Sequence, residues 1–426
     1  MNVLHFIVVL ICCTSNIDGM LPDECIDPYL NDNGLDSNSS NKANSCVFDV
    51  LNDMPGKYEP LFLQNNIHGS LTLTIPKVKN QRAVIKLKKG EKITISCPGN
   101  GNYIEAIDTI QSDGSCKSGN MLKIEGVNYS FQQLDCRARV NAKFKKTGMK
   151  CGRGKGVIVE LGYDVPGHFL PVVEVCYNID ESIPYYSRHL LRGTSLGKEP
   201  RKIGRPAYAS GGGEFFKGFN PKEAYSKRNQ LAAIRNKVGK DYAKKYIDFA
   251  SKKFLDRGQL SPYLDFVLGP HQATTFFYIN VAPMWHSINE GTWFKVEETA
   301  RSFARKYKTD LEVVTGTEGV LQLQGKKNKK DIMLRGSKFP VPKHFWKILR
   351  KPVDRSCIVF ISPNDPVRKT IPKSICKDIC TQHGWREFSG NSTEGYVYCC
   401  EYEDFKKAVP HAASLSCKNV LHVERK

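Results

Sequence analysis

Between Leu21 and Cys176, apolar and polar residues alternate in short runs that are separated by Gly, Asn and Lys. Such alternation predicts half-buried β-strands, because successive side chains of a strand point to opposite faces. We therefore expect a small β-rich domain over residues 20–176. The clearest runs are 70–75, 83–87, 92–96 and 157–161.

The pattern changes after a Gly/Pro/Arg-rich stretch, residues 192–221, which we interpret as a loop. Residues 221–237 have a helical pattern. A second helix is predicted over 241–254, where Ala243, Ile247, Ala250 and Phe254 recur every three or four residues. Lysines accompany this helix, and Lys252 and Lys253 are candidates for non-specific phosphate contacts; a solvated side of a core-facing helix is the alternative.

Residues 1–19 contain a short apolar run, Val3 to Cys13, followed by small and polar residues. This predicts a cleaved secretory signal, since the run is too short to cross a membrane. No later segment is apolar enough to span one, so we expect a soluble, secreted protein. Sequons at Asn38, Asn128 and Asn391 are compatible with secretion.

Cysteine usage also favours an oxidising compartment. Of 15 cysteines, two lie in the expected signal, and the other 13 fall in the first and last parts of the chain, with none between 177 and 356. This distribution predicts disulfide-stapled regions around a core that folds by packing. The odd number leaves one thiol that is free or pairs between chains. A zinc site is the alternative for Cys376, Cys380, Cys399 and Cys400.

The chain carries a formal net charge of +20. A field of this sign attracts polyanions such as nucleic acid, heparin-like glycans or an anionic membrane. Charge alone does not choose between these partners, so the choice must come from a motif.

One motif is the run Asp-Arg-Gly-Gln at 256–259, followed by LSP at 260–262, TFFYINVA at 275–282 and INEGTW at 288–293. This order, which continues through VTGT at 314–317 to the paired Cys399-Cys400, resembles the DNA/RNA non-specific endonuclease family over residues 177–426. The resemblance implies an α+β fold, a ββα-metal nuclease domain with a mixed sheet and helices, preceded by the small disulfide-linked β-rich domain.

The resemblance also implies a site. Asn289 occupies the metal-ligand position, and Glu297 lies near the water shell of the metal. Arg257 and Arg301 would contact the phosphate, and Asn280, at the end of the strand expected over 275–282, would lie nearby. Magnesium suits this set, because it keeps mostly water ligands plus one or two protein oxygens.

Each of these residues also has a structural interpretation. Asn289 could cap the helix that we expect to begin near it, and Asn280 could belong to a turn. Glu297 and Arg301 could form a surface pair four residues apart. Trp285 and Trp293 are expected in the core.

Gln259 stands where the family carries its catalytic histidine. An imidazole accepts a proton near neutral pH and a carboxamide does not, so the general base is missing. Losing such a base costs roughly 10²- to 10⁴-fold in rate. We therefore expect a sequence-non-specific binder of double-stranded DNA and RNA that grips the phosphate backbone and cuts weakly or not at all. The combination is similar to insect salivary proteins of this family, which implies saliva as the setting.

Two other functions remain open. One is a working magnesium nuclease that uses another base, with His271 and His286 as candidates. The other is a secreted protein that binds glycans or other polyanions through its basic field alone. The oligomeric state does not follow from the sequence.

Overall fold

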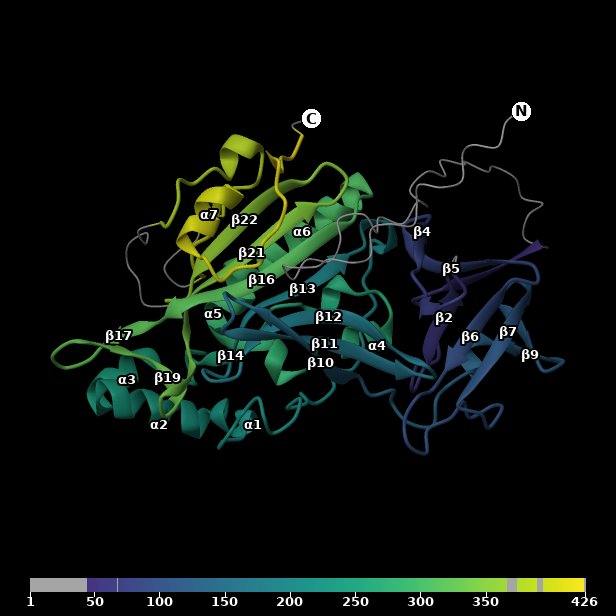
Figure 1. Ribbon diagram of the computed structural model, residues 1–426, viewed down its shortest axis with the longest axis horizontal. Coiled ribbons are helices and arrows are strands. Elements are labelled where there is room, and N and C mark those ends of the chain that lie inside the picture. Colours follow the sequence, from purple (N-terminus) through teal and green to yellow (C-terminus); the bar gives the residue numbers. More distant parts are fainter. Residues whose placement is uncertain (1–43, 67, 366–373, 389–393, 425–426) are drawn as a thin grey trace, which may run out of the picture.

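The computed structural model of the chain describes residues 44–66, 68–365, 374–388 and 394–424 (Figure 1). The expected signal at 1–19 lies outside these ranges. The predicted runs 70–75, 83–87 and 92–96 contain β-strands of two sheets, whereas 157–161 belongs to the large sheet described below. The three-stranded sheet is β1 (Ser45–Asp49), β5 (Arg82–Lys88) and β4 (Lys77–Lys79); the six-stranded sheet is β3 (Leu71–Leu73), β2 (Leu61–Asn65), β6 (Lys92–Ser96), β7 (Gln111–Ser118), β8 (Met121–Ile124) and β9 (Val127–Ser130), each in spatial order.

The rest of the described chain is built on one large sheet, in which neighbouring long strands are antiparallel. Its nine strands within the described ranges run in the order β10 (Lys143–Cys151), β11 (Gly156–Val165), β12 (His168–Asn178), β13 (Ile183–Leu191), β16 (Leu311–Val320), β21 (Pro342–Lys351), β22 (Ser356–Pro363) and β23 (Tyr398–Cys400), with β24 (Asn419–Val420) parallel to β22.

The division expected after residue 176 falls inside this large sheet, because β12 pairs with β13 across it. The disulfide Cys151–Cys176 joins β10 to β12, so two cysteines of the first group belong to the large sheet. We therefore propose a division just before β10. The hairpin of β11 and β12 still bridges the two units, since Tyr163 and Leu170 pack in the core of the N-terminal sheets.

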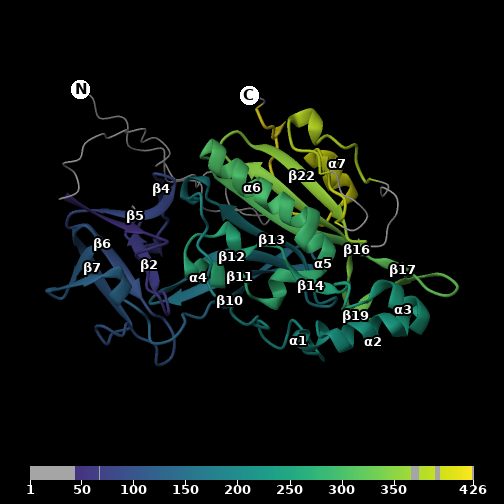
Figure 2. The same ribbon diagram turned by 180° about the vertical axis from the view of Figure 1, so that it is seen from behind.

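Both faces of the large sheet are covered. On one face lie α6 (Phe294–Tyr307) and the hairpin of β14 (Leu255–Gln259) with β15 (Val281–Trp285), as Figure 2 shows from behind. On the other face, α7 (Tyr402–Ala408) packs through Phe405, whose ring lies 5.1 Å from that of Trp346. The unbroken burial of residues 311–317 in β16 and 344–350 in β21 follows from this double burial.

The helices predicted after residue 220 form only in part. The first is confirmed as α1 (Pro221–Ala224) and α2 (Lys227–Val238). The second prediction was wrong beyond residue 246, where α3 (Lys240–Tyr246) ends and Ile247 is extended. Asp248 then accepts bonds from the Ala250 amide and the Ser251 hydroxyl, which holds a turn in place of a helix.

The strand predicted over 275–282 is also displaced toward the C-terminus. The described chain has a turn, η6 (Tyr278–Asn280), before β15 begins at Val281. The helix expected near Asn289 begins with α5 (His286–Ile288) and a π-helical turn, η7 (Asn289–Trp293), in which Gly291 is non-helical.

Further short elements are η3 (Phe131–Gln133), η4 (Gly193–Ser195), η5 (Tyr263–Asp265), α4 (Gly269–Ala273), η8 (Thr381–His383), and the strand pairs β17 (Gln322–Gln324) with β18 (Lys329–Asp331) and β19 (Met333–Arg335) with β20 (Lys338–Pro340).

All twelve cysteines of the described ranges form disulfides. The zinc alternative is therefore wrong, because its four sulfurs are consumed in Cys376–Cys400 and Cys380–Cys399. Cys25, the odd one, lies outside the described residues. No helix within them has the length and apolar character needed to cross a membrane.

A buried ion pair holds the N-terminal unit against the loop at 192–221. Arg201 lies 2.9 Å from the Glu59 carboxylate and also donates to the backbone carbonyls of Val50 and Pro55. The other Glu59 oxygen accepts from the Gly269 amide at 3.1 Å. Burial raises the pKa of Glu59 from 4.5 to about 7, more than Arg201 and the Gly269 amide lower it.

A carboxyl group whose pKa is raised in the folded state makes that state less stable as pH rises. The folded protein holds the Glu59 proton between pH 4.5 and about 7, where the unfolded chain has released it. We expect this carboxyl to lower the free energy of unfolding by up to about 3 kcal/mol across that window. Glu59→Gln should flatten this part of the pH profile in denaturant unfolding at pH 5 and pH 8. The matched control is Glu105→Gln, an exposed glutamate of the same unit; equal slopes in both variants would contradict the assignment.

Candidate nucleic-acid cleft

A cleft of about 820 Å³ lies beside the β14–β15 hairpin. It contains four of the positions that the motif singled out, Arg257, Gln259, Asn289 and Glu297, and two further groups that sequence reasoning missed. One group is cationic, and the other is aromatic. The cleft is lined by Asp256, Arg257, Gln259, Asn289, Glu290 and Glu297, by Lys202, Arg205 and Lys222, and by Tyr208, Tyr263, Phe276, Tyr278 and Phe294, among others.

The β14–β15 hairpin places the motif at the cleft. Arg257 pairs with Pro283 and Gly258 with Ala282 across the two strands. A Cβ atom at Gly258 would lie 2.8 Å from the Cβ of Met284, so close strand packing requires glycine at this position. Arg257 is exposed, and its guanidinium lies 5.0 Å from the ring centre of Tyr208. The stacked ring orients the guanidinium toward the cleft.

The Gln259 amide is fixed by its neighbours. Its nitrogen donates to the Thr275 hydroxyl at 3.0 Å and to the Thr275 carbonyl at 3.1 Å. Its oxygen accepts from the Tyr263 amide at 3.4 Å. The side chain is half-buried at the wall of the cleft, where it can share hydrogen bonds but cannot take up a proton from a nucleophile.

Beside it lies a cluster of Asp256, His286, Asn289 and Glu290. The Asp256 carboxylate lies 2.8 Å from Nδ1 of His286 and accepts from the Asn289 amide nitrogen at 3.1 Å. The other ring nitrogen of His286 lies 3.2 Å from Glu290, and the ring stacks on Phe254 at 4.6 Å. Both nitrogens of His286 are thus occupied by carboxylates. Asn289 has used only its nitrogen, which leaves its carbonyl oxygen to accept other partners.

These residues fit a hard divalent cation. Asn289, Asp256 and Glu290 all line the cleft, and their side chains carry amide and carboxylate oxygens. Oxygens of this kind are the ligands that magnesium prefers. This fit depends only on the oxygen atoms of Asn289, Asp256 and Glu290. The residue at position 259 does not change it.

Asn289 does not share a regular helix with Glu297 and Arg301, since Gly291 is non-helical and α6 begins only at Phe294. Trp293 is buried in the core, as is Trp285, which confirms that part of the prediction. Glu297 reaches the cleft. Arg301 does not line it, because its guanidinium is 2.9 Å from Asp265 and 4.0 Å from Glu297.

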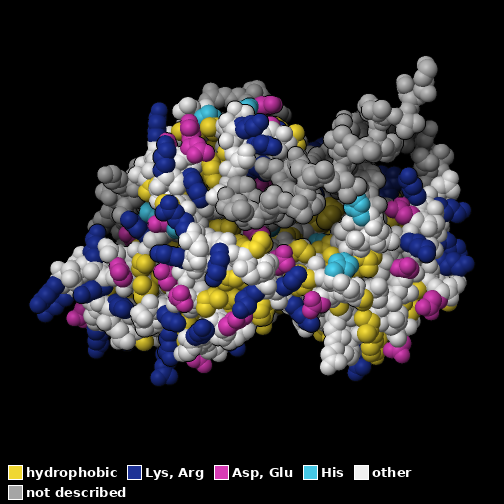
Figure 3. Space-filling view, viewed as in Figure 1, with side chains coloured by type: hydrophobic (Ala, Val, Ile, Leu, Met, Phe, Trp, Pro, Cys, Tyr) yellow, Lys and Arg dark blue, Asp and Glu magenta, His cyan; other side chains and the backbone are white. Residues whose placement is uncertain are grey.

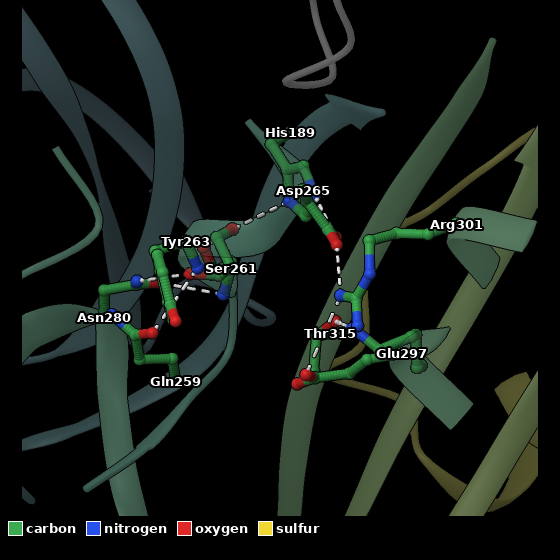
Figure 4. A network of polar contacts seen from close by, with 11 residues as sticks. His189, Gln259, Ser261, Tyr263, Asp265, Asn280, Glu297, Arg301 and Thr315 are labelled. Carbon is green, nitrogen blue, oxygen red and sulfur yellow. Dashed lines mark hydrogen bonds and ion pairs between the residues drawn. The ribbon is translucent and has the colours of Figure 1, made fainter. Parts of the chain in front are cut away.

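Arg301 belongs to a buried polar network (Figure 4). Asp265 accepts from Arg301 through one oxygen and lies 2.9 Å from Nε2 of His189 through the other. Nδ1 of His189 continues to the Ser261 hydroxyl at 2.8 Å. The pKa of Asp265 stays below its ordinary value, because His189 and Arg301 together outweigh the effect of burial.

Glu297 and Lys347 form the inner end of this network. Burial raises the pKa of Glu297 to about 7, although Lys347 and Arg301 lower it. Burial also lowers the pKa of Lys347, whose ammonium donates to the Thr315 hydroxyl at 2.5 Å. At neutral pH the carboxyl at the cleft is therefore poised between its two protonation states.

Four other candidates lie away from the cleft. Asn280 is fully buried, uses its amide on Ser261 and Thr275, and does not line the cleft. Lys252 and Lys253 are exposed in the turn before β14 but do not line the cleft. His271 is buried off the cleft, and burial lowers its pKa to about 4.

Comparison with known proteins identifies the family. The model of the DNA/RNA non-specific endonuclease family matches residues 156–405, beginning where β11 begins. A salivary endonuclease of Lutzomyia longipalpis is 31% identical over 371 residues, covering 86% of this chain and 83% of that protein. Salivary protein Tsal2A of Glossina morsitans morsitans is 26% identical, covering 84% and 90%.

Among solved structures, a chain of the EndoG/EndoGI complex aligns with a TM-score of 0.35 and 16% identity, covering 58% of this chain and 85% of that one. Members of the matched family generally use a divalent metal. The disulfides of the described ranges, together with the salivary relatives, indicate a secreted protein. The chain belongs to the DNA/RNA non-specific endonuclease family.

Proposed function

We propose that this protein is a secreted, sequence-non-specific nucleic-acid-binding protein derived from a nuclease, with weak or absent phosphodiesterase activity. The proposal rests on the residue at position 259, in a cleft that still contains other residues of the expected site. Gln259 is hydrogen-bonded to Thr275 where the family carries its base, while Arg257, Asn289 and Glu297 still line the same cleft. The salivary relatives support saliva as the setting.

Binding follows from the charge of the cleft and of the surface around it. Lys202, Arg205, Lys222 and Arg257 line the cleft. Side chains of Lys and Arg also project from the end of the molecule that carries the β17–β18 hairpin, α2 and α3 (Figure 3). Cations that contact phosphates bind double-stranded DNA and RNA without reading base edges. The proposal therefore assigns both nucleic acids as partners.

Magnesium would be held by Asn289, with Asp256 and Glu290 close to it. Bound there, it would offset negative charge on the phosphate and on the leaving oxygen. Arg257 orients the phosphate by hydrogen bonding, because its planar guanidinium offers paired donors. Glu297 accepts hydrogen bonds from waters in the cleft when it is ionised. The chain supplies no proton acceptor at position 259, so the attacking water keeps its proton and cutting stays slow.

Gln259→His should restore a base at the family's position. We expect magnesium-dependent plasmid cleavage to rise by roughly 10²- to 10⁴-fold, with little change in affinity. Gln259→Asn serves as the control, because it changes the packing against Thr275 without adding an imidazole. Rapid digestion by the wild type at catalytic concentrations would contradict the proposal.

Arg257→Ala should weaken binding to duplex DNA and RNA about tenfold, because an ionic hydrogen bond to a phosphate is lost. The slope of affinity against salt should fall by about one. Arg335→Ala, at an exposed arginine that does not line the cleft, is the matched control and should change affinity by less than about twofold. If the protein is instead a general polyanion binder, both variants will behave alike and heparin will bind as tightly as nucleic acid of equal charge.

An active nuclease is the second candidate, and one observation favours it. His286 lies 2.8 Å from Asp256, next to Asn289, in an arrangement that orients an imidazole. Its other nitrogen is engaged by Glu290, so this group would accept a proton only after Glu290 moves away.

His286→Gln separates the two candidates, since glutamine keeps a polar side chain beside Asp256. We expect the variant to retain whatever weak cleavage the wild type shows in a magnesium-dependent RNA digestion. A loss of about 10²-fold or more, with binding unchanged, would establish His286 as the base and overturn the leading proposal.

A further inference from the structure

A row of aromatic rings along one wall of the cleft is not used by the chemistry described above. The Tyr263 ring lies 5.9 Å from that of Phe276, which lies 5.1 Å from that of Tyr208, which in turn lies 5.4 Å from that of Tyr278. The four rings come from three separate segments of the chain and meet only in the folded protein. All four line the cleft.

The row has a buried layer and a layer that solvent can reach. Phe276 and Tyr278 are buried, at 3% and 4% exposure, and they support the other two rings from behind. Tyr208 and Tyr263 are only half-buried. Each carries an arginine over its ring: Arg205 lies 5.3 Å from the centre of Tyr263, and Arg257 lies 5.0 Å from that of Tyr208. Partly open rings beside cations therefore face the cleft.

The accessible end of the row lies next to the altered catalytic position. The Tyr263 amide donates to the Gln259 side chain, and Figure 4 shows the two residues side by side. A group stacked on Tyr263 would thus belong to a nucleotide close to the phosphate held by Arg257. Phe294, 43% exposed at the start of α6, adds a further apolar surface to the same cleft.

We propose that Tyr263 and Arg205 form a stacking subsite for an unpaired nucleobase, so that the cleft favours single-stranded or locally opened nucleic acid. A duplex hides the faces of its bases inside the stack, whereas an unpaired base offers a π-face to an aromatic ring and an arginine. Stacking on a ring ignores base identity, which agrees with sequence-indifferent binding. This inference rests on the proposed function and deepens it.

The test uses two DNA single strands of equal length, one normal and one made of abasic residues. Both carry the same phosphates, and only the first has bases. We expect Tyr263→Ala to weaken binding of the normal strand by about fivefold or more. The abasic strand should bind the wild type and Tyr263→Ala equally. Tyr263→Trp should keep the tight binding of the normal strand, because it restores a ring.

A closely matched control exists in the N-terminal unit. Arg137 lies 5.4 Å from the ring centre of Tyr103, the same pairing in a place outside the cleft. Tyr103→Ala should leave both strands unaffected. Equal weakening of the two strands by Tyr263→Ala, or no weakening of either, would overturn the stacking subsite while leaving the proposed function intact. Failure of the wild type to bind any strand or duplex would overturn the proposed function itself.

Discussion

The site depends on the buried contacts of the Asp265 carboxylate with His189 and Arg301. This carboxylate is almost fully buried and joins three parts of the chain: η5, to which it belongs, β13 through His189, and α6 through Arg301. Burying a carboxylate costs free energy unless the group is paired and hydrogen-bonded. Asp265 therefore keeps His189 and Arg301 in place beside it. Asp265 thus connects the segment that follows Gln259 to the helix that carries Glu297.

The same dependence explains why a carboxamide at position 259 in place of an imidazole would leave the rest of the cleft supported. Gln259 forms its hydrogen bonds to Thr275 and Tyr263, and does not bond directly to Asp265 or to the cluster around Asp256. Its link to Asp265 is indirect, through Thr275, Asn280, Ser261 and His189. An exchange of imidazole for carboxamide therefore alters proton transfer while the oxygens of Asn289 and the guanidinium of Arg257 keep their supports.

The N-terminal unit contributes to the cleft indirectly. Arg201 is bound to Glu59, and the Lys198 amide donates to the Gln81 carbonyl, so the loop at 192–221 is fastened to this unit. Lys202 and Arg205, which follow directly, line the cleft. A loop without such anchors would sample many conformations, and its cations would bind phosphate at a larger entropic cost. The unit thus positions one wall of the cleft, in addition to forming its own core.

Much of this protein was determined by local sequence. The alternating runs predicted strands because side chains two residues apart in a strand point to the same face. The order of the motif residues identified the family. Gln259 predicted by its chemistry alone that an acid–base group is missing. Local pattern also failed where a side chain competed with the backbone, as at Asp248, where a turn ended the predicted helix.

Tertiary structure decided which candidates share a site. Arg301 and Asn280 satisfied the motif equally well, but one is committed to Asp265 and the other is buried against Ser261. Arg205, Tyr208 and Tyr263 carry no local signal, and they reach the cleft only because distant segments pack together. Residue spacing along a chain fixes the face of a helix or strand. Which side chains meet across space depends on long-range packing, and that information is not contained in any short stretch of sequence.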